Sequence, residues 1–164
     1  MNIKSTIYLD TSVINFLFAD DAPELKAATN DLFENFIRTG IYDTFISEYV
    51  LREINKTNDI QKKESLLKSI ENYPIDLLEV TKENEIETLA DEYCRLQVIP
   101  KNKKMDALHV ALCMVSKIDY LVSWNYKHLA NVTREKKINA INLQYNYLHP
   151  LRICTPLELI DYGN

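Results

Sequence analysis

Hydrophobic positions along the chain fall into two alternating patterns. Short apolar runs, typical of buried strands, lie at 7–9, 42–46, 75–80, 118–123 and 152–154. Between these runs, apolar residues recur every three or four positions, as they do on the buried face of an amphipathic helix. Strands that alternate with helices favour a mainly parallel sheet covered on both faces, so the pattern predicts an α/β fold with four to five strands.

Capping residues and prolines set the expected helix limits. Pro23 is a favourable helix start, Ser47 is a favourable N-cap, and Tyr73-Pro74 stops a helix over 60–70. Further helices are expected after strand one as far as Phe18, from Thr81 through 93, over 105–115, around 128–130 and 134–138, and after Thr155-Pro156. The 164 residues contain no internal repeat, low-complexity tract or linker, so residues 1–164 are predicted to form one domain.

Composition excludes several classes of protein. No apolar run approaches the roughly 20 residues that cross a bilayer, and the N-terminus lacks a signal-peptide pattern, so a cytoplasmic location is expected. The three widely spaced cysteines fit free thiols. Two glycines cannot build a Gly-rich phosphate loop, and paired-cysteine zinc motifs are missing from the sequence. A net charge of −5 argues against a nonspecific nucleic-acid coat protein, but not against an enzyme that acts on nucleic acid.

Polar side chains follow the predicted strands at the points where these end. Asp10 follows the first strand, Glu48 and Glu53 lie in the helix after the second, and Asn125 follows the fourth. Asp106 begins the helix over 105–115. Each residue has an ordinary structural explanation as a helix cap or a charge near a helix N-terminus. Independent caps have no reason to converge on one end of a sheet, however, and that end is where ligands bind in open α/β folds.

Clustered carboxylates imply a cation. Acidic groups within a few ångströms raise one another's pKa unless a positive charge neutralises them. Mg²⁺ or Mn²⁺ prefers oxygen ligands of this kind, and such an ion can stabilise the charge that builds on a phosphodiester during displacement. The residue pattern therefore indicates metal-assisted chemistry.

The chain resembles a known family, the PIN-domain ribonucleases, and among them most closely the VapC-like toxins of type II toxin–antitoxin pairs. The matching segments span nearly the whole sequence: Tyr8–Ile14, Ile46-Ser47 followed six residues later by Glu53, Asp106–Ala111, Asp119–Asn125 and Ile153–Leu159. The resemblance implies a PIN-like three-layer fold. It also implies a Mg²⁺- or Mn²⁺-dependent endoribonuclease that forms a homodimer and is blocked by a small antitoxin protein.

The resemblance also assigns roles to residues. Asp10, Glu53 and Asp106 would hold the metal, and Asn125 would stand where many relatives carry a fourth catalytic acid. An amide supplies no negative charge, so one tightly bound metal is expected. Glu48 and Ser123 are auxiliary candidates.

The predicted acidic residues have basic and aromatic neighbours in the sequence. Lys103, Lys104 and Lys127 flank the acidic residues and are candidates to guide RNA phosphates. His109 is expected to be a satisfied helix histidine and not a general base, and packing is the expected role of Trp124.

Three other interpretations are weighed against the nuclease. A degenerate PIN-like module that binds RNA or protein without cutting stays open, because Asn125 departs from the acidic pattern. A phosphotransfer receiver needs a paired acid where Thr11 stands, and an aspartate phosphatase needs a second aspartate where Ser12 stands. These two residues therefore argue against the last two interpretations.

Overall fold

A single parallel sheet organises the protein. The computed structural model describes residues 3–162. Its five strands run parallel in the order β3-β2-β1-β4-β5. Their bounds are β1 Thr6–Leu9, β2 Asp43–Ser47, β3 Ile75–Leu78, β4 Tyr120–Val122 and β5 Arg152–Cys154. The predicted α/β fold with a parallel sheet is confirmed.

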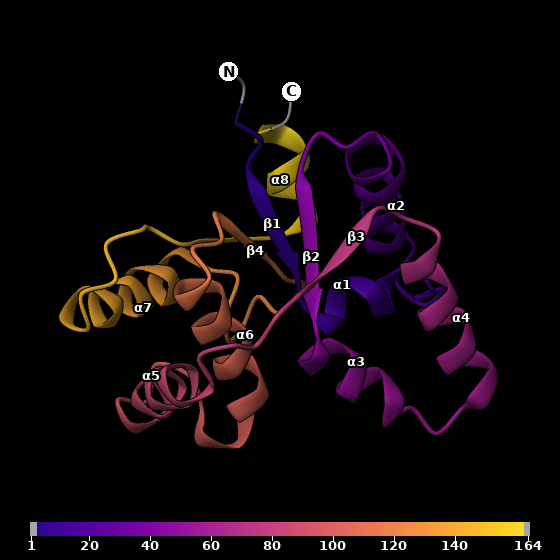
Figure 1. Ribbon diagram of the computed structural model, residues 1–164. Coiled ribbons are helices and arrows are strands. Elements are labelled where there is room, and N and C mark those ends of the chain that lie inside the picture. Colours follow the sequence, from indigo (N-terminus) through magenta and orange to yellow (C-terminus); the bar gives the residue numbers. More distant parts are fainter. Residues whose placement is uncertain (1–2, 163–164) are drawn as a thin grey trace.

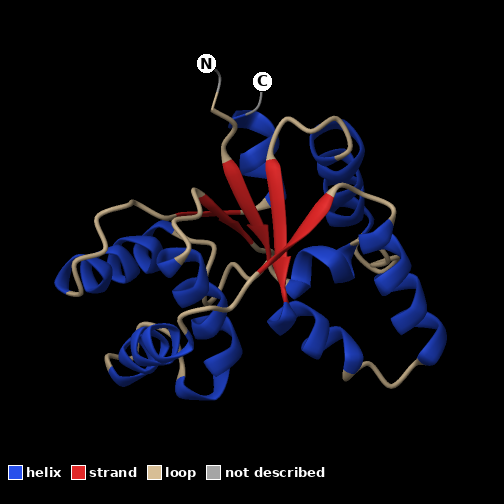
Figure 2. Ribbon diagram, in the orientation of Figure 1, coloured by secondary structure: helices blue, strands red, loops and turns tan. Residues whose placement is uncertain are grey.

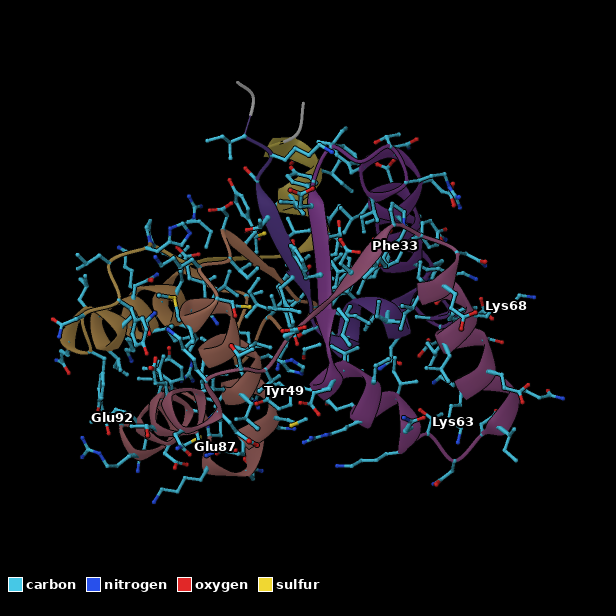
Figure 3. All side chains as sticks on the ribbon, viewed as in Figure 1. Phe33, Tyr49, Lys63, Lys68, Glu87 and Glu92 are labelled. Atoms are coloured by element: carbon cyan, nitrogen blue, oxygen red, sulfur yellow. The ribbon has the colours of Figure 1, made fainter. Side chains whose placement is uncertain are left out.

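Helices cover both faces of the sheet (Figures 1 and 2). On one side lie α1 (Thr11–Phe16), α2 (Pro23–Asp31) with its π-helical continuation η1 (Leu32–Ile37), α3 (Glu48–Asn55), α4 (Ile60–Glu71) and α8 (Pro156–Tyr162). On the other lie α5 (Glu83–Arg95), the short 3₁₀ turn η2 (Lys101–Lys103), α6 (Lys104–Val115) and α7 (Val132–Gln144). Lys63 and Lys68 on α4 point away from the sheet, as expected of a solvated helix face (Figure 3).

The position of β1 explains where a ligand can bind. This strand is central, and its residues Ile7, Tyr8 and Leu9 are fully buried. From β1 the chain moves outward to β2 and β3 on one side, and it later returns to fill β4 and β5 on the other. The boundary between β1 and β4 is therefore the topological switch point, and the crevice beyond the carboxyl ends of the strands at such a point is the usual ligand site.

Several expected helix boundaries are corrected by the structure. The short helix expected around 128–130 is wrong, because residues 126–129 form a turn. The helix expected around 134–138 is present but longer, as part of the 13-residue α7. Helix α5 begins at Glu83, with Lys82 in place of Thr81 as its N-cap. None of the helices described here is long and apolar enough to cross a membrane.

Candidate active site at the carboxyl edge of the sheet

Asp10 stands directly after β1 and has two roles. Its Oδ1 accepts hydrogen bonds from the backbone N–H of Val13, which makes it the N-cap of α1, and from Ser12 Oγ at 2.5 Å. Ser12 Oγ also accepts the backbone N–H of Trp124 at 2.9 Å, which ties the loop after β1 to the loop after β4. Asp10 is thus both the helix cap and a candidate site residue. It lies at the switch point and is only 4% exposed.

Glu53 reaches the same edge from the second turn of α3. Its Oε1 accepts a hydrogen bond from Thr11 Oγ1 at 2.6 Å and lies 2.6 Å from His109 Nε2. Burial opposes ionisation of this carboxyl, but the contacts with His109 and Thr11 outweigh it and lower the pKa of Glu53. Glu53 is therefore an ionised, oriented carboxylate whose side chain remains 29% exposed.

Asp106 and Asn125 meet across the site. Asn125 Nδ2 donates to Asp106 Oδ2 at 3.1 Å, and Asn125 Oδ1 accepts the backbone N–H of His128 at 3.1 Å. Ser123 is fully buried beside them, and its Oγ accepts the backbone N–H of Asn125 at 3.0 Å. The structure thus brings Asn125 and Ser123 to the acidic edge, where the sequence placed them.

The three acids interact through their charges. Burial, followed by the charge of Asp10, raises the pKa of Asp106 to about 6, and the charge of Glu53 adds to this shift. Burial also raises the pKa of Asp10, and the hydrogen bond from Ser12 opposes this shift. A buried carboxyl whose pKa is raised further by neighbouring carboxylates indicates a site that gains from a cation.

The oxygen atoms of the three acids and of Asn125 are of the kind that binds a hard divalent cation. Within residues 3–162, no group of three or more His, Cys, Asp or Glu side chains is already arranged to hold a metal ion. Among the described residues, however, Glu53 Oε2 and Asp106 Oδ1 accept no hydrogen bond, so each of these two acids keeps one oxygen available. Anionic oxygen donors are those that Mg²⁺ and Mn²⁺ prefer, and Asn125 adds one amide.

Two predicted site residues are engaged elsewhere. Glu48 pairs with Arg52 one turn along α3, at 2.5 Å, and makes no contact with the acids. Lys104 pairs with Glu87 and Asp91 of α5. By contrast, Lys103 and Lys127 have no ion pair within the part of the chain that the structure describes, and the pKa of His128 is lowered by burial and then by nearby cations that include both lysines.

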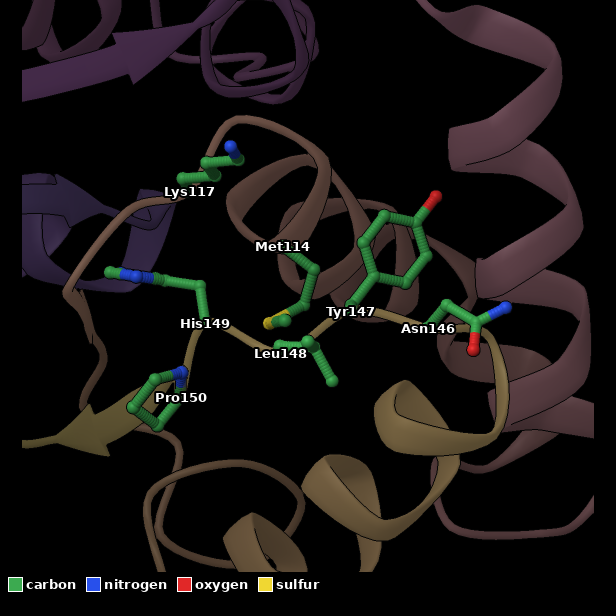
Figure 4. A pocket seen from close by; sticks show the side chains of 7 residues that line it. All are labelled: Met114, Lys117, Asn146, Tyr147, Leu148, His149 and Pro150. Atoms are coloured by element: carbon green, nitrogen blue, oxygen red, sulfur yellow. The ribbon is translucent and has the colours of Figure 1, made fainter.

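A hollow of about 490 Å³ lies away from the acids, where the chain enters β4 and β5 (Figure 4). Its wall is formed by the end of α6 and by the segment 146–150. His149 Nε2 stands 3.0 Å from Asp119 Oδ1 there. This hollow belongs to the opposite edge of the sheet and contains none of the predicted site residues.

Comparison with solved structures identifies the architecture. A chain of the crystal structure of DNA-bound VapBC from Salmonella typhimurium superimposes with a TM-score of 0.54 at 12% identity. The match covers 93% of this chain and 98% of the other. The fold is PIN-like. No protein-family profile and no curated protein matches the sequence.

Sequence reasoning missed the polar residues that support the acids of this PIN-like site. Tyr8 was expected only as part of a buried strand, yet its hydroxyl lies 2.6 Å from His109 Nδ1 and 2.7 Å from Ser47 Oγ. Thr11 and Ser12, which in the sequence served as arguments against a receiver and a phosphatase, donate hydrogen bonds to Glu53 and Asp10. A tyrosine inside a buried strand is a usable signal, since its hydroxyl must find a partner.

Proposed function

We propose that the chain is a metal-dependent endoribonuclease of the PIN-like, VapC-like type. The observation that carries the proposal is the meeting of Asp10, Glu53 and Asp106 from three different elements at the switch point. Burial, and then the charges of Asp10 and Glu53, raise the pKa of Asp106 to about 6, which supports a site that gains from a positive charge. The PIN-like fold supports a nuclease in general, and the substrate and the metal are part of the proposal.

Asp10, Glu53 and Asp106 would hold Mg²⁺ or Mn²⁺, with the Asn125 carbonyl oxygen as a further neutral ligand. The bound ion would supply the positive charge that offsets the acids and the developing charge on the phosphodiester. The chain itself fixes the geometry: Ser12 orients Asp10, Thr11 and His109 orient Glu53, and Asn125 orients Asp106.

The RNA backbone would reach this edge past Lys103 and Lys127. Lys103 lies shortly before Asp106 in the sequence, and Lys127 lies shortly after Asn125. Neither lysine forms an ion pair with an acid among the described residues. Lysines of this kind position phosphates without reading sequence. Lys104 is left out of this role because Glu87 and Asp91 already bind it.

Two partner proposals accompany the function. The matched structure is of a VapBC complex, which supports a small antitoxin that covers the acidic edge of the sheet in this chain. We also propose a homodimer, on the sequence resemblance alone. Co-purification with the protein encoded by the neighbouring gene, followed by light scattering, tests both.

The deciding experiment is cleavage of a mixed RNA pool by purified protein in Mn²⁺ or in EDTA. Asp10→Asn is the matched variant, because asparagine caps a helix as well as aspartate while removing one charge. Metal-dependent cleavage that is lost in Asp10→Asn is the expected result. If wild type and variant are equally inert on several RNAs and calorimetry detects no Mn²⁺ binding, the catalytic proposal fails and the non-cleaving RNA- or protein-binding module replaces it.

A further inference from the structure

A chain of buried hydroxyl and imidazole groups runs from the end of β2 to Glu53. Ser47 Oγ accepts the backbone N–H of Tyr49 at 3.1 Å and lies 2.7 Å from Tyr8 Oη. Tyr8 Oη lies 2.6 Å from His109 Nδ1, and His109 Nε2 lies 2.6 Å from Glu53 Oε1. Ser47, Tyr8 and His109, here called the Tyr8 chain, are each at most 1% exposed.

Only one arrangement of hydrogens satisfies every group of the Tyr8 chain. If His109 carries its proton on Nε2, it donates to Glu53, and its bare Nδ1 accepts from the Tyr8 hydroxyl. Tyr8 Oη then accepts from Ser47 Oγ, which in turn accepts the backbone N–H of Tyr49. If Nδ1 also carried a proton, Tyr8 would donate to Ser47, and the Ser47 hydroxyl hydrogen would have no acceptor among the described residues, which is costly in a buried site.

We infer that the Tyr8 chain is a positioning device that fixes His109 as the Nε2–H tautomer and thereby aims the carboxylate of Glu53 at the cation site. Its geometry matches this role, because His109 and Thr11 both contact Oε1, and among the described residues Oε2 accepts no hydrogen bond. Groups behind a metal ligand commonly fix its orientation in this way. The inference rests on the proposed function, since it assigns the chain to the same metal.

The structure supplies a matched pair of variants. Tyr8→Phe removes the hydroxyl that sets the tautomer. Tyr49→Phe removes a hydroxyl that is buried without a hydrogen-bond partner, from a ring that packs edge-on to His109 with centroids 6.2 Å apart. The two changes are chemically identical and affect two rings that both lie beside the His109 imidazole, so a difference between them reports the hydrogen bond and not the ring.

The first readout needs neither RNA nor metal. The sequence has three histidines, so long-range proton–nitrogen NMR correlations resolve the tautomer of each, with a His109→Gln spectrum as the assignment. Wild type and Tyr49→Phe are expected to show His109 as the Nε2–H form at neutral pH, and Tyr8→Phe to show a mixture. A His109 that carries its proton on Nδ1, or on both nitrogens, in wild type would overturn the inference.

The second readout is Mn²⁺ affinity by calorimetry. Tyr8→Phe is expected to weaken binding about 10- to 100-fold, the usual cost of losing such a supporting group. Tyr49→Phe should bind as wild type does. If Tyr8→Phe folds poorly, His109→Gln, whose amide can still donate to Glu53, is expected to retain more affinity than His109→Leu.

Failure of this inference is distinct from failure of the nuclease proposal. Folded Tyr8→Phe and His109→Leu proteins that bind Mn²⁺ as tightly as wild type would overturn the positioning role, whether or not RNA is cleaved. Wild-type protein that binds no Mn²⁺ overturns it as well. A wild type that binds Mn²⁺ in a Tyr8-dependent way but cuts no RNA supports the positioning role and refutes only the nuclease.

Discussion

Replacing Asp106 by asparagine should stabilise the metal-free protein and do so in a pH-dependent manner. The folded state raises the pKa of Asp106 from 3.8 to about 6. The folded protein therefore binds more protons than the unfolded chain between these values, and its stability falls as pH rises through this window. Above pH 6 the ionised Asp106 costs about 3 kcal/mol, at about 1.4 kcal/mol for each unit of pKa.

The free energy of unfolding, measured in urea with EDTA, tests this reasoning. The stability gain of Asp106→Asn over wild type should grow from about 1 kcal/mol at pH 4.5 to about 3 kcal/mol at pH 8. Asparagine keeps an oxygen that can accept the hydrogen bond from Asn125, so packing is retained. Adding Mn²⁺ should then stabilise wild type more than the variant, because the variant has lost a ligand.

Asp76→Asn on the exposed surface of β3 serves as the control. Its stability should stay within about 0.5 kcal/mol of wild type at both pH values, as for most surface substitutions. The reasoning is refuted if Asp106→Asn is no more stable than wild type at pH 8 in EDTA. A gain of equal size at both pH values would also refute it, since the cost of burying the ionised carboxylate beside other acids vanishes on protonation.

Three further variants test neighbouring features of the site. Lys103→Ala should lower RNA affinity and reduce the slope of log affinity against log salt by about 1, whereas Lys104→Ala should leave both unchanged in binding assays, because Lys104 is already paired. Trp124→Phe, which loses an indole hydrogen bond of 2.9 Å, should destabilise the fold by about 1–3 kcal/mol in urea without weakening RNA binding. Asn125→Asp should lower metal-free stability and raise Mn²⁺ affinity in calorimetry, because it replaces a donor to Asp106 by a fourth charge.

The strand ends of this fold could be predicted because local signals agreed with the global topology. The apolar run at 7–9 followed by Asp10 marks a strand, a cap and a switch point within a few residues. The positions of Asp106 and Asn125 follow from the same alternation of strands and helices, since parallel strands share one carboxyl edge. Three predicted acids and one amide thereby reach the same edge without any long-range information from the sequence.

Long-range polar contacts explain most of what could not be predicted. Helix α7 contains Asn139 and Asn142, which weaken a helical pattern when counted by propensity. Here Asn139 bonds the backbone of Leu151 and Asn142 bonds the hydroxyl of Tyr93, so tertiary partners stabilise one continuous helix. The ion pairs of Lys104 could not be predicted from its sequence position for the same reason, because its partners lie on α5.

Asn125 shows how the site balances stability against charge. Its amide donates to Asp106 and accepts the backbone N–H of His128, so both ends of one side chain are used within the protein. A fourth carboxylate in this position would repel Asp106, whose pKa is already about 6 with two neighbouring acids. The amide therefore stabilises the metal-free fold through both of its polar atoms. If the proposed function holds, the three acids would supply the charge for one cation, and the neutral amide of Asn125 would weaken the binding of a second.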